Sequence, residues 1–472
     1  MNWKTILKSL KSRDMQKRIL IVLGLMIVYR FLAHIPVPLA DPTTLRQVID
    51  NLVQSTDLGG FLNLLSGGAL ASLSIVLVGL SPFITASVIT QLLTKAIPKL
   101  EELHNDGESG RRKIQQWTRV IALPLAIMQS VAFIFILRQT VLAGNTGLDI
   151  VASTSPMQWV LMIAAMAGGS MLLMWLGELM TEQGVGNGMS LLIFAGIIAA
   201  LPQTLGTVVG SVTTVTNDSE KLRILDATLP INAVALLVVV LLSIASLMAL
   251  YLIVKLNEAQ RVITINYAKR IQGNRAYGGV ASILPIKLIT AGVIPVIFAV
   301  AFLALPSFIG QVLLSTNSDR MQQIGNTLVT WFQTPTAQTF STGEPSSLIY
   351  PALYFLLVVG FTYFYTSIVF NATEIAENLQ KQGGFIPNIR PGQQTEKYLS
   401  SVVTRLTLFG SLALGVIAIL PFICEFLFAK FGVQASNLAI GGTGLLIVVS
   451  VTLETLRHLS SRALMVTYDQ DY

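Results

Sequence analysis

The sequence predicts an all-α membrane protein with about ten transmembrane helices, from its composition and the spacing of its apolar runs. Of its 472 residues, 53% are hydrophobic and 12% are charged, whereas soluble domains carry about 25% charged residues. Apolar runs close to the roughly 20 residues that a transmembrane helix needs recur along the chain. Pro82, Pro124 and Pro295 lie inside such runs and predict kinks. The predicted spans are residues 19–38, 74–93, 117–138, 156–177, 188–209, 231–255, 284–305, 348–370, 402–428 and 439–457.

The second of these segments is interrupted. A short apolar piece at residues 59–65 is followed by Ser66-Gly67-Gly68, and a longer helix is expected from Ser74 to Leu93. A short helix and a glycine break at membrane depth are tolerated only inside protein or beside a water-filled cavity. The longer helix also carries Ser87 and Gln91 on a stripe next to its apolar stripe. This segment is therefore predicted to face a channel or a movable partner helix rather than lipid.

The distribution of basic residues predicts the orientation in the membrane. Of the 31 Lys and Arg residues, 24 lie in the N-terminal segment, in the loops at 95–119, 255–287 and 381–405, and in the C-terminal tail. Cytoplasmic loops carry the excess of Lys and Arg, so both termini are predicted to be cytoplasmic. The apolar run after the basic N-terminus lacks a small-residue cleavage site and is expected to remain as a span. The positive charge of each basic loop has two equally good explanations: it keeps the loop on the cytoplasmic side, or it binds a partner.

The ten predicted spans divide into two groups of five. Because five is odd, a repeat relating the two groups would be inverted in the membrane. We expect a cytoplasmic amphipathic segment at 1–18, an N-terminal half at 19–209, a C-terminal half at 210–457 with cytoplasmic loops at 256–283 and 371–401, and a cytoplasmic tail at 458–472.

Few residues are suited to metal binding or catalysis. The single cysteine, Cys424, excludes an internal disulfide framework, and His34, His104 and His458 are scattered. HExxH and GxSxG motifs are absent, and the predicted spans hold no Asp pair. We therefore expect no metal site, no cofactor and no enzyme activity.

An ion-coupled secondary transporter built from inverted repeats is the alternative class. Such transporters need a carboxylate or an unwound ion site near the midplane. Glu178, Glu374 and Glu377 instead lie at predicted cytoplasmic helix ends, and no charged pair is predicted across mid-membrane spans. The carboxylate pattern therefore favours a channel over a transporter.

The cytoplasmic loop at 257–275 alternates side chains in the period of a strand. Val262 and Thr264 alternate with Ile263 and Ile265, which predicts a strand or hairpin. This element would carry three basic residues into the cytoplasm: Arg261, Lys269 and Arg270.

A second cytoplasmic loop, GGFIPNIRPG at 383–392, holds Arg390 between two prolines. Pro387 and Pro391 restrict the backbone and so limit where the guanidinium points. A fixed guanidinium suits a bidentate contact with a carboxylate or phosphate of a partner. A solvated turn is the alternative interpretation of the same residues.

Five motifs occur in a fixed order: GVGNGMSLLIFAG at 184–196, NYAKR at 266–270, AGVIPVIF at 291–298, IPNIRPG at 386–392 and GGTGLLIVV at 441–449. Together with the interrupted segment, their order and spacing resemble the SecY family of bacterial protein-conducting channels, from about residue 15 to 457. The resemblance implies an hourglass channel with a plug and a lateral gate. Such a channel passes signal-bearing polypeptides and releases transmembrane segments into lipid.

The resemblance also implies roles for individual residues. An apolar collar at the narrowest point would comprise Leu80, Ile84, Met189, Ile193, Ile297 and Ile447. The plug, within residues 59–73, would include Phe61, Leu62, Asn63, Leu64, Leu65, Ser66, Gly67 and Gly68. A lateral gate between the helices at 74–93 and 284–305 would include Ser87, Val88, Gln91, Ile289, Thr290 and Ile294. Taken singly, each collar isoleucine is more often an ordinary core residue, so the collar depends on the resemblance.

The implied partners are the small membrane subunits SecE and SecG, the SecA ATPase, the ribosome, signal peptides, unfolded polypeptides and membrane lipid. The motor or ribosome would dock on Arg261, Lys269, Arg270 and Arg390. One departure from the family affects the gate: the Asn that is common one turn before the IPVIF motif is replaced by Ile289, so Gln91 is expected to lack its usual partner. The C-terminal tail, with Met465-Val466-Thr467-Tyr468, also differs.

Overall fold

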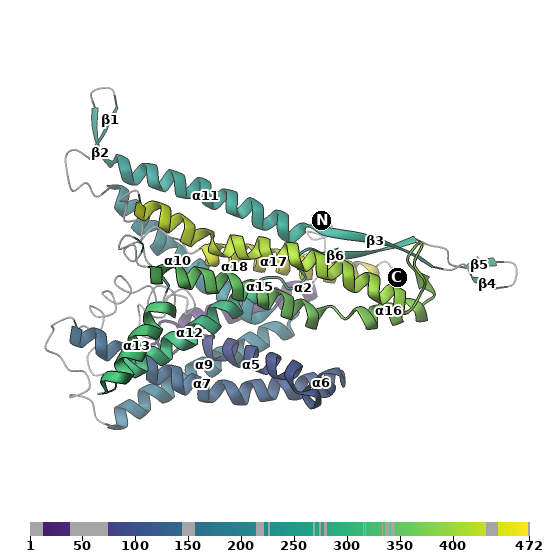
Figure 1. The fold of residues 1–472 in the computed structure, drawn as a ribbon, viewed down its shortest axis with the longest axis horizontal. Coiled ribbons are helices and arrows are strands. Elements are labelled where there is room, and N and C mark those ends of the chain that lie inside the picture. The colour runs from purple at the N-terminus through teal and green to yellow at the C-terminus, as the bar shows by residue number, and fades with distance from the viewer. Residues whose placement is uncertain are drawn as a thin grey trace.

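The computed structural model describes residues 13–37, 74–143, 156–213, 221–224, 227–267, 270–272, 275–277, 281–314, 316, 318–332, 334–335, 340, 345–430 and 442–470. In this part the chain is mainly helical (Figure 1). The helices are α2 (Arg13–Leu32), α5 (Ser81–Ala96), α6 (Pro98–Asn105), α7 (Glu108–Ala143), α9 (Pro156–Glu182), α10 (Gly188–Thr213), α11 (Ala233–Glu258), α12 (Ile294–Leu314), α13 (Asp319–Phe332), α15 (Ile349–Val369), α16 (Ala372–Lys381), α17 (Gln393–Lys430) and α18 (Gly442–Gln470).

Each of the ten predicted spans overlaps one of these helices. Within the described residues, six helices are long and apolar enough to cross a membrane. The chain is therefore a multi-pass membrane protein, as predicted, and the total of ten spans remains a prediction.

Two helices begin later than predicted. The helix expected from Ser74 begins at Ser81, and the helix expected from residue 284 begins at Ile294. Pro82 and Pro295 therefore lie in the first turn of a helix and do not kink one, because the missing N–H of proline is tolerated at that position. Pro124 does lie inside α7, as predicted.

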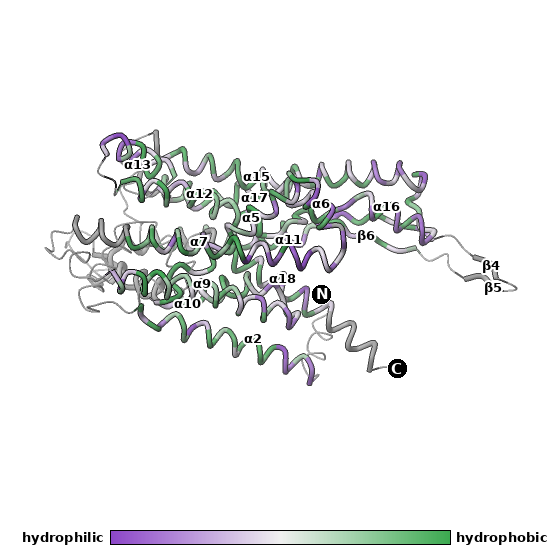
Figure 2. The backbone as a smooth tube through the Cα atoms, turned by 90° about the horizontal axis from the view of Figure 1, so that it is seen from below, coloured by the Kyte–Doolittle hydropathy of each residue, from purple (hydrophilic) through white to green (hydrophobic). Residues whose placement is uncertain are grey.

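Polar and apolar residues separate along the helix bundle (Figure 2). Hydrophobic residues dominate the middle of α7, α9, α10 and α12, and hydrophilic residues gather at the end that carries α6, α16 and the start of α2. These hydrophilic elements fall in the N-terminal segment and in the loops at 95–119 and 371–401, which the charge pattern predicts to be cytoplasmic. The hydrophilic end of the bundle therefore coincides with the predicted cytoplasmic side.

A small sheet joins the two predicted cytoplasmic loops. Strands β3 (Gln260–Tyr267) and β6 (Ala281–Lys287) are antiparallel, and the short β7 (Gly384–Phe385) pairs with the other edge of β3. Ile263 and Ile265 are buried while Val262 is exposed, so the predicted strand alternation is confirmed. Beyond β3 and β6, the hairpin of β4 (Arg270–Gln272) and β5 (Arg275–Tyr277) extends away from the helices (Figure 1).

Besides α6 and α16, which lie in predicted loops, two further elements were not predicted. One is a hairpin of β1 (Lys221–Ile224) and β2 (Ala227–Asn232). The other is α13, which runs back along α12: a Cβ on Gly325 would lie 2.7 Å from the carbonyl oxygen of Gly310. The close approach of the two backbones requires glycine at this crossing.

Candidate channel constriction, gate and docking surface

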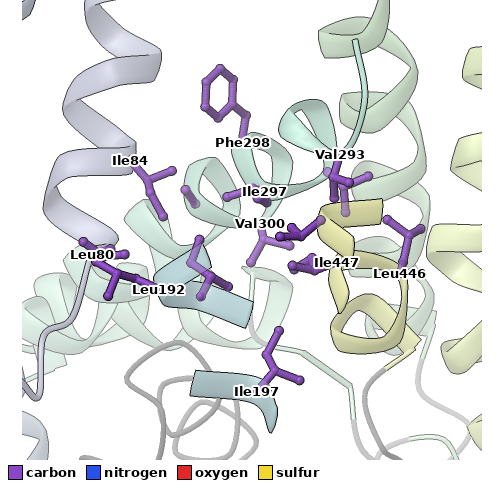
Figure 3. Packing of buried hydrophobic residues seen from close by; sticks show 14 of the residues in the cluster. Leu80, Ile84, Leu192, Ile197, Val293, Ile297, Phe298, Val300, Leu446 and Ile447 are labelled. Carbon is purple, nitrogen blue, oxygen red and sulfur yellow. The ribbon is translucent and has the colours of Figure 1, made fainter. Parts of the chain in front are cut away.

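Apolar side chains from both halves meet in the middle of the bundle (Figure 3). Leu80 and Ile84 approach from the start of α5, Leu192 and Ile197 from α10, Ile297 and Val300 from α12, and Leu446 and Ile447 from α18. All six predicted collar residues belong to the resulting hydrophobic cluster or pack against it. Five of them are less than 10% exposed: Leu80, Ile84, Ile193, Ile297 and Ile447.

Met189, the sixth predicted collar residue, is only partly buried. Its sulfur lies in the space over Gly177 of α9, where a Cβ on that glycine would come within 2.5 Å. The structure therefore places this side chain against a helix of its own half. Leu192, one turn further along α10, is 1% exposed and was not predicted to take part.

The two predicted lips of the gate are each packed against a second helix. On one side α5 packs against α7, and on the other α12 packs against α15. The ring of Phe298 on α12 makes edge-to-face contacts with Phe361 and Tyr365 of α15, at centroid distances of 6.2 and 6.3 Å, a geometry that adds about 0.5–1.5 kcal/mol per pair. In contrast, no hydrogen bond or ion pair joins α5 to α12 within the described residues, although the helices are in contact.

The predicted gate residues separate into two groups. On α5, Gln91 donates a hydrogen bond from Nε2 to Ser87 Oγ at 3.1 Å, and its buried Oε1 has no partner in the described part of the chain. Ile289 and Thr290 lie in the turn before α12 rather than in a helix: Thr290 lies 3.2 Å from the hydroxyl of Thr366 on α15, and Ile289 packs over Gly410 of α17. Gln91 therefore hydrogen-bonds within its own helix, and the replacement of its usual partner by Ile289 stays a prediction.

A cavity of about 390 Å³ lies between α5, α6, α7 and α15. Its lining combines hydroxyl, amide and charged side chains from α5, α6 and α7 with Tyr365 and Ile368 of α15. Burial, followed by the nearby Arg111 and Lys95, lowers the pKa of His104 in this lining. The cavity is therefore lined by groups that can bind both a polar chain segment and an apolar side chain.

Arg390 is held as the two flanking prolines predict. Ile389 N–H donates to the carbonyl oxygen of Ile386 at 3.1 Å, and Thr395 Oγ1 donates to the carbonyl oxygen of Arg390 at 2.9 Å. Ile386 is buried in a small hydrophobic core with Ile263 of β3. The backbone is thus fixed from both sides, while the Arg390 side chain is exposed.

Of the other predicted docking residues, Arg261 is exposed on β3, near the helices. Arg270 lies in β4, beyond the end of β3. Lys269, the side chain of Arg270 and the plug residues 61–68 lie outside the described residues. Arg261 and Arg390 are therefore the two predicted docking residues whose side chains the structure describes, both exposed, in two loops that the β3–β6–β7 sheet joins.

The end of α11, just before β3 begins, is hydrogen-bonded to α18, a contact that the sequence did not predict. Asn257, at the end of α11, donates to Ser450 Oγ at 3.0 Å, and Arg457 donates to the carbonyl oxygen of Asn257. Burial and then Arg457 lower the pKa of Lys287 at the end of β6, while Glu454 acts in the opposite direction. No sequence motif signals these contacts, because they join residues about two hundred positions apart.

The comparisons with known proteins agree with this geometry. The family model described as SecY matches residues 74–456. The chain is 39% identical to the protein translocase subunit SecY of Mycobacterium tuberculosis over 465 residues, and 39% identical to that of Streptomyces griseus over 464 residues. Each match covers 98% of this chain and 98% of the relative. Solved structures with the same fold include a protein-conducting channel (TM-score 0.57, 18% identity, covering 93% of this chain and 90% of that one) and Sec61 from a canine ribosome–channel complex (TM-score 0.53, 17% identity, 93% and 90%).

The fold is accordingly that of a protein-conducting membrane channel. By the extent of the family match and the identity to its relatives, the chain belongs to the SecY family.

Proposed function

We propose that this chain is the pore-forming subunit of a membrane protein translocase. It passes unfolded, signal-bearing polypeptides across the membrane and releases transmembrane segments sideways into lipid. The observation that carries the proposal is the buried apolar cluster to which α5, α10, α12 and α18 contribute, in a fold shared with SecY channels.

The chemistry of the constriction suits this task. A narrow apolar neck excludes water and ions by dewetting, and it offers no fixed hydrogen-bonding pattern to a passing chain. A collar of Leu80, Ile84, Ile193, Ile297 and Ile447 would therefore seal the resting channel and still accept varied sequences. Met189 and Leu192 would line the α10 side at successive turns.

The seam between α5 and α12 is the proposed lateral gate. Its two lips are each packed firmly to a neighbour, while contact across the seam has no hydrogen bond or ion pair in the described residues. Opening the seam would thus disrupt apolar contacts that lipid or an apolar signal helix can replace. The adjoining 390 Å³ cavity would receive the polar start of a signal sequence.

The β3–β6–β7 sheet, which carries Arg261, and the adjoining loop of Arg390 form the proposed docking surface for a SecA-type ATPase or for the ribosome. Sec61 in the canine complex is a channel bound to a ribosome. Strand β6 ends at Lys287 and α12 begins at Ile294, so a force on this surface would reach the gate helix directly. SecE and SecG are the proposed small subunits, in a cell membrane with both termini of this chain in the cytoplasm.

The transporter alternative finds no support in the charged residues. The ion pairs in the described part of the chain lie at the hydrophilic end, as Arg119–Glu178 and Lys95–Glu101 do. Groups of three or more His, Cys, Asp or Glu side chains that could hold a metal are absent from the described residues.

Reconstitution tests the proposal. Vesicles containing the chain with its small subunits, a motor ATPase and ATP should protect a signal-bearing client from external protease. A client with a charge inserted in its signal, and vesicles without the chain, are the matched controls. Equal protection with and without an intact signal would contradict the proposal.

A further inference from the structure

The chain that leads into α5 is buried but not helical. Ser74 bridges to Pro36, and residues 75–80 form turns. Val76 and Leu80 are 0% and 3% exposed, and these turns lie beside Gly169, the central residue of α9. Non-helical backbone at membrane depth persists only where protein or water satisfies its polar groups.

Neighbouring elements supply those hydrogen bonds. The N–H of Ile75 donates to the carbonyl oxygen of Ile35, after α2, at 3.0 Å. From the other side, Ser170 of α9 donates its hydroxyl to the carbonyl oxygen of Gly79 at 2.8 Å. Ser170 is 3% exposed, and Gly79 has a φ of +63°, a conformation that glycine adopts without strain.

Two adjacent glycines of α9, Gly168 and Gly169, differ in the space available for a Cβ, and this difference shows which of them contacts the turn. A Cβ on Gly169 would overlap with the carbonyl oxygen of Ile75, whereas a Cβ on Gly168 would have no neighbour within 4 Å. Of these two glycines, only Gly169 is needed for the close approach of α9 to the turn.

The same turn joins two hydrophobic cores. Val76 and Leu80 belong to the central cluster that contains the proposed collar, and Leu77 and Val78 belong to a second cluster with Phe133 of α7. The residue that follows this turn directly is Ser81, the first of α5. A shift of the turn would therefore move Leu80 and the beginning of the gate helix together.

We infer that Gly169 and Ser170 are positioning residues for the constriction: they fix residues 74–80 against α9 and so set the place of Leu80 in the collar. They act through Leu80 and do not line the path themselves. The inference rests on the proposed function, because the collar role of Leu80 belongs to it.

The test measures ion leak through the full complex in sealed vesicles, together with export of a client with a defective signal. Ser170→Ala should raise the leak by up to about tenfold, as the loss of one buried hydrogen bond does for a two-state equilibrium. Gly169→Ala should also raise the leak, because its Cβ would overlap with the carbonyl oxygen of Ile75 and push the turn away from α9. Gly168→Ala is the matched control and should remain sealed. Gly325→Ala, which disturbs the α12–α13 crossing, controls for a general loss of packing.

Each outcome decides between the explanations. Sealed Gly169→Ala and Ser170→Ala channels beside a leaking Ile297→Asn channel would overturn this inference and leave the proposed function standing. A sealed Ile297→Asn channel would remove the collar and the inference together. Equal leak in Gly169→Ala and Gly325→Ala would assign the effect to packing and also overturn it. If Gly169→Ala does not accumulate, Ser170→Ala, which removes only a hydroxyl, gives the answer.

Discussion

At the scale of single residues, the collar and the docking arginine owe their proposed roles to opposite environments. Ile297 and Ile447 are 9% and 7% exposed and lie among apolar side chains from four helices. The Arg390 side chain is exposed on a backbone that hydrogen bonds and prolines hold in place. A polar atom is therefore disruptive at the first site, and a change of charge is disruptive at the second.

Ile297→Asn and Ile447→Asn should open the resting seal. An amide wets a dewetted neck, so we expect ion leak to rise about tenfold, equivalent to roughly 1.4 kcal/mol, together with more export of a signal-defective reporter. The measurements are conductance in planar bilayers and reporter export in cells. Ile283→Asn, at an exposed position of β6, is the control. Wild-type conductance in both collar variants at normal protein levels would reject the collar.

Arg390→Glu should abolish motor-driven export while the complex remains assembled, because the exposed side chain makes no ion pair with the described residues that its loss would break. Arg390→Lys should retain part of the activity, because lysine keeps the charge and loses the forked geometry. Export rate and copurification of the small subunits are measured together. Arg320→Glu on α13 is the matched charge reversal. Loss of the whole complex in Arg390→Glu membranes would instead assign the residue a structural role.

At the scale of elements, the proposed gate consists of two pairs of helices, and no hydrogen bond or ion pair in the described residues joins α5 to α12 across the seam. The pair α5–α7 and the pair α12–α15 are each packed within themselves, and the turn before α12 is tied to α15 through Thr290 and Thr366. A movement of the gate should therefore separate α5 from α12 and leave α12 and α15 together.

Disulfides across the seam should stop transport. In a Cys424→Ser background, Ser87→Cys is combined with single cysteines from Ile294 to Leu305. Only pairs with Cα atoms within about 4.4–6.8 Å should oxidise readily, so reactive positions should recur at helical spacing. Oxidation should block export and reductant should restore it.

A disulfide within one lip is the control for this experiment. Thr290→Cys with Thr366→Cys joins hydroxyl positions only 3.2 Å apart on the same side of the gate, and oxidation there should leave export unchanged. A fully cross-linked α5–α12 pair that exports at the normal rate would show that these two helices form a static wall.

At the scale of the whole molecule, the basic loops predict which end of the bundle faces the cytoplasm. The helix α13 and the β3–β6 sheet are connected to opposite ends of α12, since β6 precedes α12 and α13 follows it. In the Cys424→Ser background, an impermeant thiol reagent should label Thr327→Cys on α13 in intact cells. It should label Ile283→Cys on β6 only after the membrane is opened. Labelling of both from the same side would contradict the topology.

Composition and periodicity alone determined the membrane class, the helix in each predicted span, the hydrophilic end and the strand at 260–267, because these depend on local sequence. Local signals also existed for the two misplaced helix starts: Ser81-Pro82 and Ile294-Pro295 place proline in a first turn, where it begins a helix. The resemblance to SecY supplied the prediction of a collar, whose proposed members come from four separate helices.

Only the tertiary structure decided which distant residues meet. It brought the loop of Arg390 and the loop of Arg261 into one sheet, turned Met189 toward Gly177, and placed Gly169 and Ser170 against the turn before α5. For a glycine in a helix or a serine in an apolar span, the neighbouring sequence does not indicate which distant residue it contacts. These contacts depend on how whole helices pack, because the backbone of residues 74–80 finds its hydrogen bonds on α9 and after α2, and not within its own segment.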